Sequence, residues 1–256
     1  MEITTTTYLI ILPMIFLAGL IDSIAGGGGL ISVPAYLAAG LPPHFALGNN
    51  KFSSFSGTIF TTVRYFRHGM IDIPVAVTSA LFALIGSTLG TKTVLWLDPS
   101  FVYYILLFLI PAMTIFTIMK KQMGTDNNSH TISKALKLIV GASAGLIIGF
   151  YDGFFGPGTG SFLIMVYALI LKYDFVMANG NTKVVNLASN LAALITFLIN
   201  GKVIFAIAIP AALCGIAGNL LGSHVVVKKG NKIIKPVFVG ALVLLMGKII
   251  YDLIVK

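Results

Sequence analysis

The stretch GFYDGFFGPGTGS, from Gly149 to Ser161, places five glycines, one proline and one aspartate inside an apolar region of the chain. Glycine and proline mark turns, and turns normally lie in water. The flanking runs LKLIVGASAGLII and FLIMVYALIL are instead typical of helices that lie in lipid. Because unpaired backbone groups cannot face lipid, a break at this depth must line a cavity or pack against protein.

The composition of the whole chain agrees with a membrane location. Of its 256 residues 57% are hydrophobic and only 10% are charged, whereas soluble domains carry about 25% charged residues. The net charge of +9 comes from Lys and Arg gathered between apolar runs, a pattern of topology signals and lipid contacts. The sequence therefore predicts an all-α polytopic membrane protein with the lipid bilayer as its partner, and no nucleic-acid binding.

The apolar runs predict one transmembrane domain, 1–256, built from two four-segment halves. Repeat 1 is expected over about 8–120, a cytoplasmic linker over about 121–134, and repeat 2 over about 135–256. Spanning helices need about 20 apolar residues, and each half opens with a segment that glycines interrupt. The candidate segments are about 8–25 with a shorter piece 30–40, 45–65, 73–96 and 101–119, then 135–152 with a shorter piece 160–171, 184–200, 203–224 and 235–254.

The two halves match each other in an ordered series of residues. Asp152 lies 130 positions after Asp22, so DSIAGGGG corresponds to DGFFGPGT. The motif GNTK lies 132 positions after GNNK, and at that offset three glycine pairs also align, Gly69 with Gly201, Gly86 with Gly218, and Gly90 with Gly222. Internal repeats in membrane proteins are typical of transporters that bind their substrate at the repeat interface.

Positive charges favour one of two topologies. If each half crosses four times and the N-terminus lies inside, 9 of the 17 Lys and Arg lie inside and 8 outside. If each glycine-broken segment enters and returns, the halves are inverted and 12 lie inside against 5 outside. The second arrangement fits better and makes the basic loops 64–68, 120–137 and 228–235 cytoplasmic. The first stays open because the segment 8–25 is long enough to cross alone.

The glycine loops are candidates for an anion site. A helix that restarts after a break directs free N–H groups and a positive dipole end into the adjoining cavity. We therefore predict substrate contacts from the two loops, with Ser161 as a helix cap. An alternative is that the glycines only allow close helix packing. The loop candidates are Gly27, Gly28, Gly29, Gly158, Thr159, Gly160 and Ser161.

The Asn–Lys motifs are the second set of candidates. Asn49 with Lys51, and Asn181 with Lys183, offer an amide and a cation at the expected start of an apolar helix. Asn186 lies on the following segment, where polar groups usually face the bundle interior. The alternative is that the lysines extend to lipid headgroups and the asparagines cap or join helices.

Two acids, Asp22 and Asp152, lie deep in apolar sequence. An intramembrane carboxylate indicates function by default, often in proton coupling. A carboxylate that stayed ionised beside a bound anion would repel it, so each acid either carries a proton or pairs with Lys51 or Lys183 and holds its loop. The sequence leaves both roles open, together with coupling to a proton or to sodium.

Enzyme chemistry has no support in the sequence. The four histidines have no metal-ligand spacing, and neither HExxH, GxSxG nor a Walker A pattern occurs. We therefore expect no catalytic residue, no metal and no cofactor.

The stretch GFYDGFFGPGTGSF, its counterpart LIDSIAGGGGLISVPAYLAAG, and the paired GNNK and GNTK resemble the TauE/SafE membrane transporters, a family described as sulfite exporters. The resemblance covers nearly the whole chain. It implies a plasma-membrane transporter of sulfur-containing oxyanions or organosulfonates in a prokaryote. The first loop has four plain glycines where the second reads GPGTG, so the two halves need not contact substrate equally.

The sequence thus predicts export of sulfite or an organosulfonate by alternating access, with one repeat rocking against the other. An ion-coupled transporter of another metabolite or amino acid, and a non-transporting membrane scaffold or assembly factor, are the alternatives. The substrate, the direction of transport and the oligomeric state stay open, a homodimer among the options.

Overall fold

The computed structural model describes residues 4–98, 126–234 and 236–237. These residues form helices and connecting turns without a strand among them, which confirms the all-α class. The predicted segments at about 101–119 and most of 235–254 lie outside the described residues, as do Lys120 and Lys121. The helices are α1 Thr5–Ala25, α2 Gly29–Ala38, α3 Pro43–Arg67, α4 Ile73–Trp96, α6 Lys134–Phe154, α7 Thr159–Leu169, α8 Phe175–Ile199 and α9 Phe205–Lys229, with a short 3₁₀ turn at Ser129–Thr131.

Five of these helices, α1, α4, α6, α8 and α9, are long and apolar enough to cross a membrane. Helix α3 has 25 residues but is more polar, because it carries the motif Gly48–Lys51 and several serines. Those polar side chains are buried or half-buried, so the polar face of α3 is turned to the interior of the bundle, while Phe60, Val63 and Phe66 are exposed. The chain is therefore a multi-pass membrane protein with a polar helix face in its interior.

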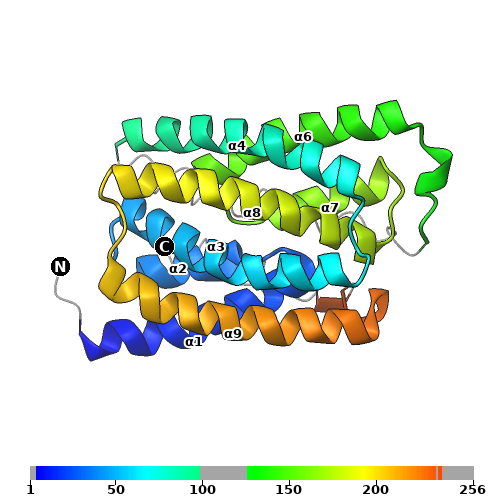
Figure 1. The fold of residues 1–256 in the computed structure, drawn as a ribbon. Coiled ribbons are helices and arrows are strands. Elements are labelled where there is room, and N and C mark those ends of the chain that lie inside the picture. Colours follow the sequence, from blue (N-terminus) through cyan, green and yellow to red (C-terminus); the bar gives the residue numbers. More distant parts are fainter. Residues whose placement is uncertain (1–3, 99–125, 235, 238–256) are drawn as a thin grey trace, which may run out of the picture.

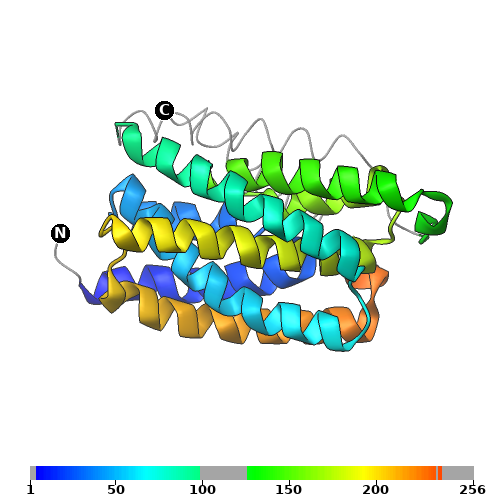
Figure 2. The ribbon, with the colours of Figure 1, turned by 45° about the horizontal axis from the view of Figure 1, so that its top comes forward.

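The helices lie side by side in two groups, which Figures 1 and 2 show in two orientations. The first group is α1, α2, α3 and α9, and the second is α4, α6, α7 and α8 (Figure 1). Each group takes one helix from the other half of the sequence, since α9 packs on α1 and α4 packs on α6. The two halves are thus interleaved, and α3 and α8 make the central contact between the groups.

Small residues make the close helix pairs possible. A methyl group at Gly86 or Gly90 of α4 would overlap a backbone carbonyl oxygen of α6, that of Leu146 or Phe150. The pair α1–α9 uses the equivalent glycines, and a methyl group at Gly218 would overlap the Phe16 carbonyl oxygen. The aligned glycines therefore serve close packing, as small residues commonly do between membrane helices.

Each half begins with a helical hairpin. Helix α2 has 10 residues and doubles back beside α1 after the break at Gly26–Gly28 (Figure 1). Helix α7 has 11 residues and follows α6 after a break at 155–158. At about 1.5 Å per residue, neither short helix can cross a bilayer core of about 30 Å.

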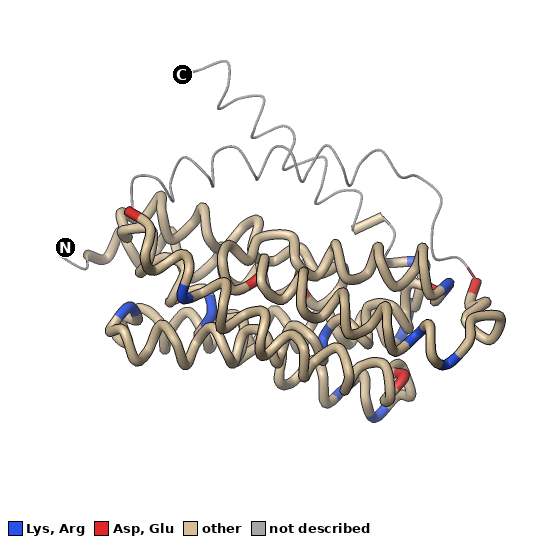
Figure 3. The backbone as a smooth tube through the Cα atoms, turned by 90° about the horizontal axis from the view of Figure 1, so that it is seen from above, with Lys and Arg blue, Asp and Glu red and all other residues tan. Residues whose placement is uncertain are grey.

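Several connecting segments meet at one end of the bundle. The Tyr173 hydroxyl donates to Asp72 Oδ2 at 2.5 Å, and Lys137 Nζ lies 3.6 Å from the same oxygen. The Asn128 N–H donates to the Lys172 carbonyl at 2.9 Å. Burial, helped by Asp72, raises the pKa of Tyr173, so its hydroxyl stays protonated as a donor. Lys and Arg gather at this end (Figure 3).

One predicted helix start was too late, and the other was close. Helix α8 begins at Phe175 rather than near 184, because the Asp174 carboxylate accepts the Met177 N–H at 2.9 Å and caps it. Helix α3 begins at Pro43, a residue suited to a first helical turn. The Asn–Lys motifs therefore lie two turns inside these helices, and not at their starts as predicted.

Candidate functional site

The two glycine loops meet each other in the middle of the molecule. A methyl group at Gly26 would come within 2.7 Å of the Gly160 Cα, and one at Gly29 within 2.9 Å of the Pro157 Cα. The Ser161 hydroxyl crosses the junction and donates to the Ala25 carbonyl at 3.2 Å. The N-terminal ends of α2 and α7 are therefore close together, and both carry positive dipole ends.

Backbone geometry explains most of the loop glycines. Gly26, Gly156 and Gly158 have φ values of 72°, 96° and 84°, which side chains rarely adopt. Gly28 has ordinary dihedrals, but a methyl group there would lie 2.6 Å from the Ala18 carbonyl oxygen. Gly27 alone among the four glycines of the first loop has ordinary contacts around its Cα. Backbone conformation and close packing therefore account for most of the glycines in these loops.

The predicted cap is wrong. Helix α7 begins at Thr159 with Gly158 as its N-cap residue, and the Ser161 hydroxyl bonds α1 and not its own helix. The Thr159 hydroxyl instead donates back to the Gly156 carbonyl at 2.7 Å and closes the turn.

Two buried ion pairs connect the groups of helices. Lys51 Nζ on α3 lies 2.9 Å from Asp152 Oδ1 on α6, and Lys183 Nζ on α8 lies 2.8 Å from Asp22 Oδ2 on α1. Lys183 also donates to the Asp22 carbonyl. The lysine side chains are 1% and 0% exposed, so the interpretation that they extend to lipid headgroups is wrong.

The pairing changes the electrostatics of the site. Each lysine is neutralised by the acid of the other sequence half, so the described residues hold no free ammonium group at the loops. A buried ammonium without its partner would be strongly unfavourable. An anion can bind Lys51 or Lys183 only by sharing it with a carboxylate or by displacing one.

The surroundings of the two acids differ. Asp152 is held twice, because the Ser189 hydroxyl donates to its Oδ2 at 2.6 Å beside the ion pair with Lys51. Its side chain is 5% exposed, whereas the side chain of Asp22 is 19% exposed. Asp22 also borders a cavity.

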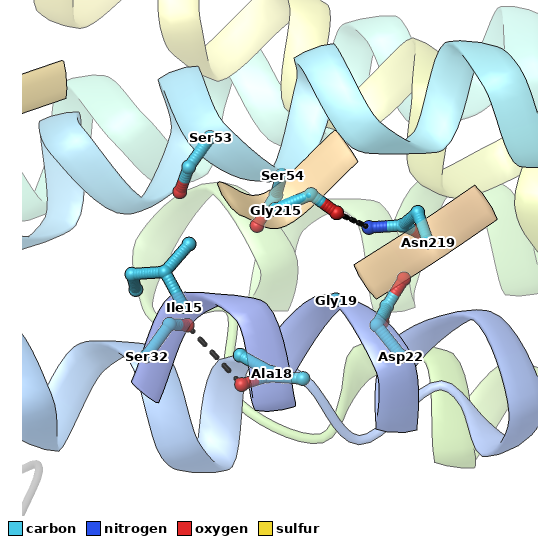
Figure 4. Close-up of a pocket in the computed structure, with 10 residues that line it drawn as sticks. Ile15, Ala18, Gly19, Asp22, Ser32, Ser53, Ser54, Gly215 and Asn219 are labelled. Carbon is cyan, nitrogen blue, oxygen red and sulfur yellow. Dashed lines mark hydrogen bonds between the residues drawn. The ribbon is translucent and has the colours of Figure 1, made fainter. Parts of the chain in front are cut away.

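The cavity beside Asp22 lies between α1, α2, α3 and α9 (Figure 4). Its volume is about 20 Å³, which is room for about one water molecule. The polar part of the lining is Asp22, Ser32, Ser53, Ser54 and Asn219, and the rest is Ile15, Ala18, Gly19, Gly28 and Gly215. A cavity of this size holds no sulfite ion in the conformation described, but it can hydrate a carboxylate.

The predicted asparagine contacts divide into two kinds. The Asn49 amide donates to the Phe45 carbonyl at 2.7 Å, and the Asn181 amide to the Met177 carbonyl at 2.7 Å. The Asn181 oxygen also accepts the Asp72 N–H at 3.2 Å, at the start of α4. These amides bond the backbone, so the structure does not place them as free donors for a substrate.

The buried side-chain oxygens of Asn49 and Asn186 find no hydrogen-bond partner among the described residues. The same holds for the Thr58 hydroxyl on the facing helix α3. Lys51 Nζ has the ion pair with Asp152 and makes no hydrogen bond of good geometry. Buried polar atoms are nearly always satisfied, so unsatisfied atoms on α3 and α8 indicate a place for water or a ligand.

Sequence reasoning missed Ser32, Asn50 and Asn219. The Ser32 hydroxyl donates to Asn50 Oδ1 at 2.5 Å, and Asn219 Oδ1 accepts the Thr61 hydroxyl at 3.0 Å. A usable signal was present, since a polar residue inside an apolar segment normally faces the bundle interior. Across the part of the chain that the structure describes, no three His, Cys, Asp or Glu residues form a metal-binding group.

Comparison with known proteins gives consistent results. The family model described as "Sulfite exporter TauE/SafE" matches residues 11–249. A "Probable membrane transporter protein" of Haemophilus influenzae is 33% identical over 93% of this chain and 92% of its own length. YfcA of Escherichia coli K12 is 32% identical (92% and 87% covered), and ORF9 of a Sinorhizobium species is 35% identical (93% and 90%). Both carry the same description as the first. No solved structure matches the chain.

Proposed function

Because the chain belongs to the sulfite exporter TauE/SafE family, it is a membrane transporter, and we propose that it exports sulfite or organosulfonates across the plasma membrane of a prokaryotic cell. The family description supports a sulfur-containing anion as the substrate and export as the direction of transport. An inside-negative membrane potential would help expel an anion, by about 2.3 kcal/mol per charge per 100 mV.

One observation carries this proposal, the meeting of two half-helix N-termini between two buried lysines. Helix N-termini bind oxyanions through free N–H groups and a positive dipole end. Sulfite and sulfonate oxygens suit several such donors at once, supplemented by an ammonium group. The proposed contacts are Gly27, Gly28, Gly29, Gly158, Thr159, Gly160, Ser161, Lys51, Lys183 and Asn186.

In this proposal the substrate anion displaces the Asp22 or Asp152 carboxylate from its lysine. In the conformation described, each carboxylate neutralises a lysine. Protonation of a carboxylate would free its lysine for the anion, which couples proton uptake to substrate binding. Asp22 is the better candidate for this exchange because it borders the cavity, while Asp152 holds its loop.

We also propose that the halves are inverted repeats, each opening with a re-entrant hairpin. In Figure 1, α1 runs from the end with the N-terminus toward the basic end, and α6 runs the opposite way. The contacts Asn128–Lys172, Lys137–Asp72 and Asn231–Val176 support a common end for the segments that the inverted topology makes cytoplasmic.

Alternating access would then move the two groups of helices and not the two halves of the sequence. The close pairs α1–α9 and α4–α6 each take one helix from each sequence half, and their backbones touch at glycines. Rocking one sequence half against the other would therefore break the contacts within both pairs. The boundary between the groups instead runs along α3 and α8, through both ion pairs and both glycine loops. Motion at this boundary opens the proposed site.

Flux of sulfite into proteoliposomes tests the proposal. The double variants Lys51→Met with Asp152→Asn, and Lys183→Met with Asp22→Asn, each remove a cation while keeping the buried pair neutral. We expect saturable flux to fall about tenfold or more in each, the usual size of a lost charged hydrogen bond. Lys92→Gln, at an exposed position, is the matched control. Unchanged flux and saturation in both double variants would contradict the proposed site.

A second candidate is an ion-coupled transporter of another small metabolite. The cavity beside Asp22 favours it, because a carboxylate, hydroxyl groups and an amide surround a space of water size. Uptake of an amino acid that depends on a sodium or proton gradient, is lost in Asp22→Asn and is insensitive to sulfite would support this candidate.

A further inference from the structure

A groove on the outside of the bundle lies apart from the proposed transport site. Its volume is about 330 Å³, and its walls come from α3, the following turn, α4 and α8. Seven of the lining residues are apolar, Val63, Phe66, Ile71, Ile73, Ala76, Val77 and Val184, and the remaining two are Thr62 and Arg67. Phe66, Ile73 and Val77 are largely exposed, as expected for a surface that faces lipid chains.

Arg67 stands at one end of this apolar groove without a partner. Among the described residues no carboxylate or carbonyl pairs with its exposed guanidinium, whereas the neighbouring Arg64 donates to the Leu220 carbonyl and to Ser223. The nearby acid Asp72 is already engaged by Lys137 and by the Tyr173 hydroxyl. The charge of Arg67 is therefore available to an anion outside the protein.

The groove also lies at the boundary between the two groups of helices. Thr62 and Arg67 belong to α3 of the first group, while Ala76 and Val184 belong to α4 and α8 of the second. The Thr62 hydroxyl donates across this boundary to the Lys183 carbonyl at 3.3 Å. A ligand seated in the groove would contact both groups next to the ion pair Lys183–Asp22.

We infer that this groove binds an anionic phospholipid, with an acyl chain along the apolar walls and the phosphate on Arg67. Arginine pairs with phosphate through two parallel N–H groups, and basic residues at the ends of membrane helices recognise anionic lipids. A second copy of the chain fits less well, because an apolar surface of that copy would not neutralise the Arg67 guanidinium. The bound lipid would tie α3 to α4 and α8 and so favour the conformation described here.

Native mass spectrometry of the detergent-purified chain tests this inference with phosphatidylglycerol and phosphatidylcholine of identical acyl chains. We expect the chain to retain more phosphatidylglycerol than phosphatidylcholine. In Arg67→Gln the ratio of retained phosphatidylglycerol to phosphatidylcholine should fall about fivefold. Lys229→Gln, an exposed basic residue at the end of α9 outside the groove, should keep the preference. Val77→Trp fills the groove and should reduce retention of both lipids.

Four outcomes would overturn the inference. One is equal retention of the two lipids by the wild-type chain. Another is an effect of Arg67→Gln no larger than that of Lys229→Gln. The third is a dimer that cross-links through a cysteine in the variant Val77→Cys and excludes lipid. The fourth is retention of inorganic phosphate as strong as that of phosphatidylglycerol, since the apolar walls would then contribute nothing.

Discussion

The ion pairs Lys51–Asp152 and Lys183–Asp22 occupy equivalent positions of the two halves but have different surroundings. Asp152 is bonded by Lys51 and Ser189 and is almost closed off, whereas Asp22 is bonded by Lys183 and borders a cavity. Both lysines are fully buried, so the difference lies with the acids. Residues at equivalent positions of the two halves, such as Asp22 and Asp152, therefore need not have the same role.

Two substitutions between the halves account for this difference. At the offset of 132 positions, Ser189 corresponds to Gly57, which offers Asp22 no hydroxyl. A methyl group at Gly57 would overlap the Asn219 amide, because that side chain fills the space. Asn219 in turn corresponds to Ser87, whose hydroxyl donates to the Ser189 carbonyl at 2.6 Å. The second group of helices thus has a serine pair that closes the Asp152 site, and the first group has a glycine and an asparagine beside the cavity at Asp22.

Removal of each acid should give the largest difference in stability between the two ion pairs. Asp152→Ala leaves the Lys51 ammonium buried without compensation, and we expect a loss of about 3–5 kcal/mol of unfolding free energy. Asp22→Ala should cost less, because Lys183 keeps the Asp22 position's backbone carbonyl as acceptor and the adjoining cavity admits water. Unfolding titrations in mixed detergent micelles measure both.

The double variant Lys51→Met with Asp152→Leu is the control for that experiment. Apolar replacement of a whole buried pair is often neutral, so stability should return toward that of the wild type. Equal losses in Asp152→Ala and Asp22→Ala, with no recovery in the double variant, would remove the distinction between the two sites.

The glycine loops offer a second test, in the loop that follows Asp22. Gly26→Ala combines a positive φ with overlap of the Gly160 backbone, so we expect a loss of about 2–4 kcal/mol. Gly27→Ala, one position along, should change stability by about 0.5 kcal/mol or less, since its Cβ would make ordinary contacts. Thermal unfolding followed by circular dichroism compares the two. A Gly26→Ala variant as stable as Gly27→Ala would mean that the loops do not pack together.

Part of this site could be predicted from the sequence. The offsets of 130 and 132 positions identified Asp22 with Asp152 and Lys51 with Lys183 as equivalent residues. The pairing across the halves could not be predicted, because it depends on interleaved helices that no local pattern encodes. The start of α8 was missed because hydropathy does not register the Asp174 cap. That the Asn49 and Asn181 amide groups donate to carbonyls of their own helices could not be predicted either, since no sequence pattern shows it.

Ser189 supplies the finest test, because it is the residue that makes the Asp152 site unlike the Asp22 site. Ser189→Ala removes a hydrogen bond to a carboxylate, which should cost about 1.5–3 kcal/mol, while the ion pair with Lys51 remains. Labelling with a water-soluble carbodiimide and mass spectrometry reads the accessibility of each acid. In the wild type we expect Asp22 to react faster than Asp152, and in Ser189→Ala we expect the Asp152 rate to rise toward that of Asp22. If Asp152 stays unreactive in Ser189→Ala, packing alone closes its site, and the serine–glycine exchange does not explain why the halves differ.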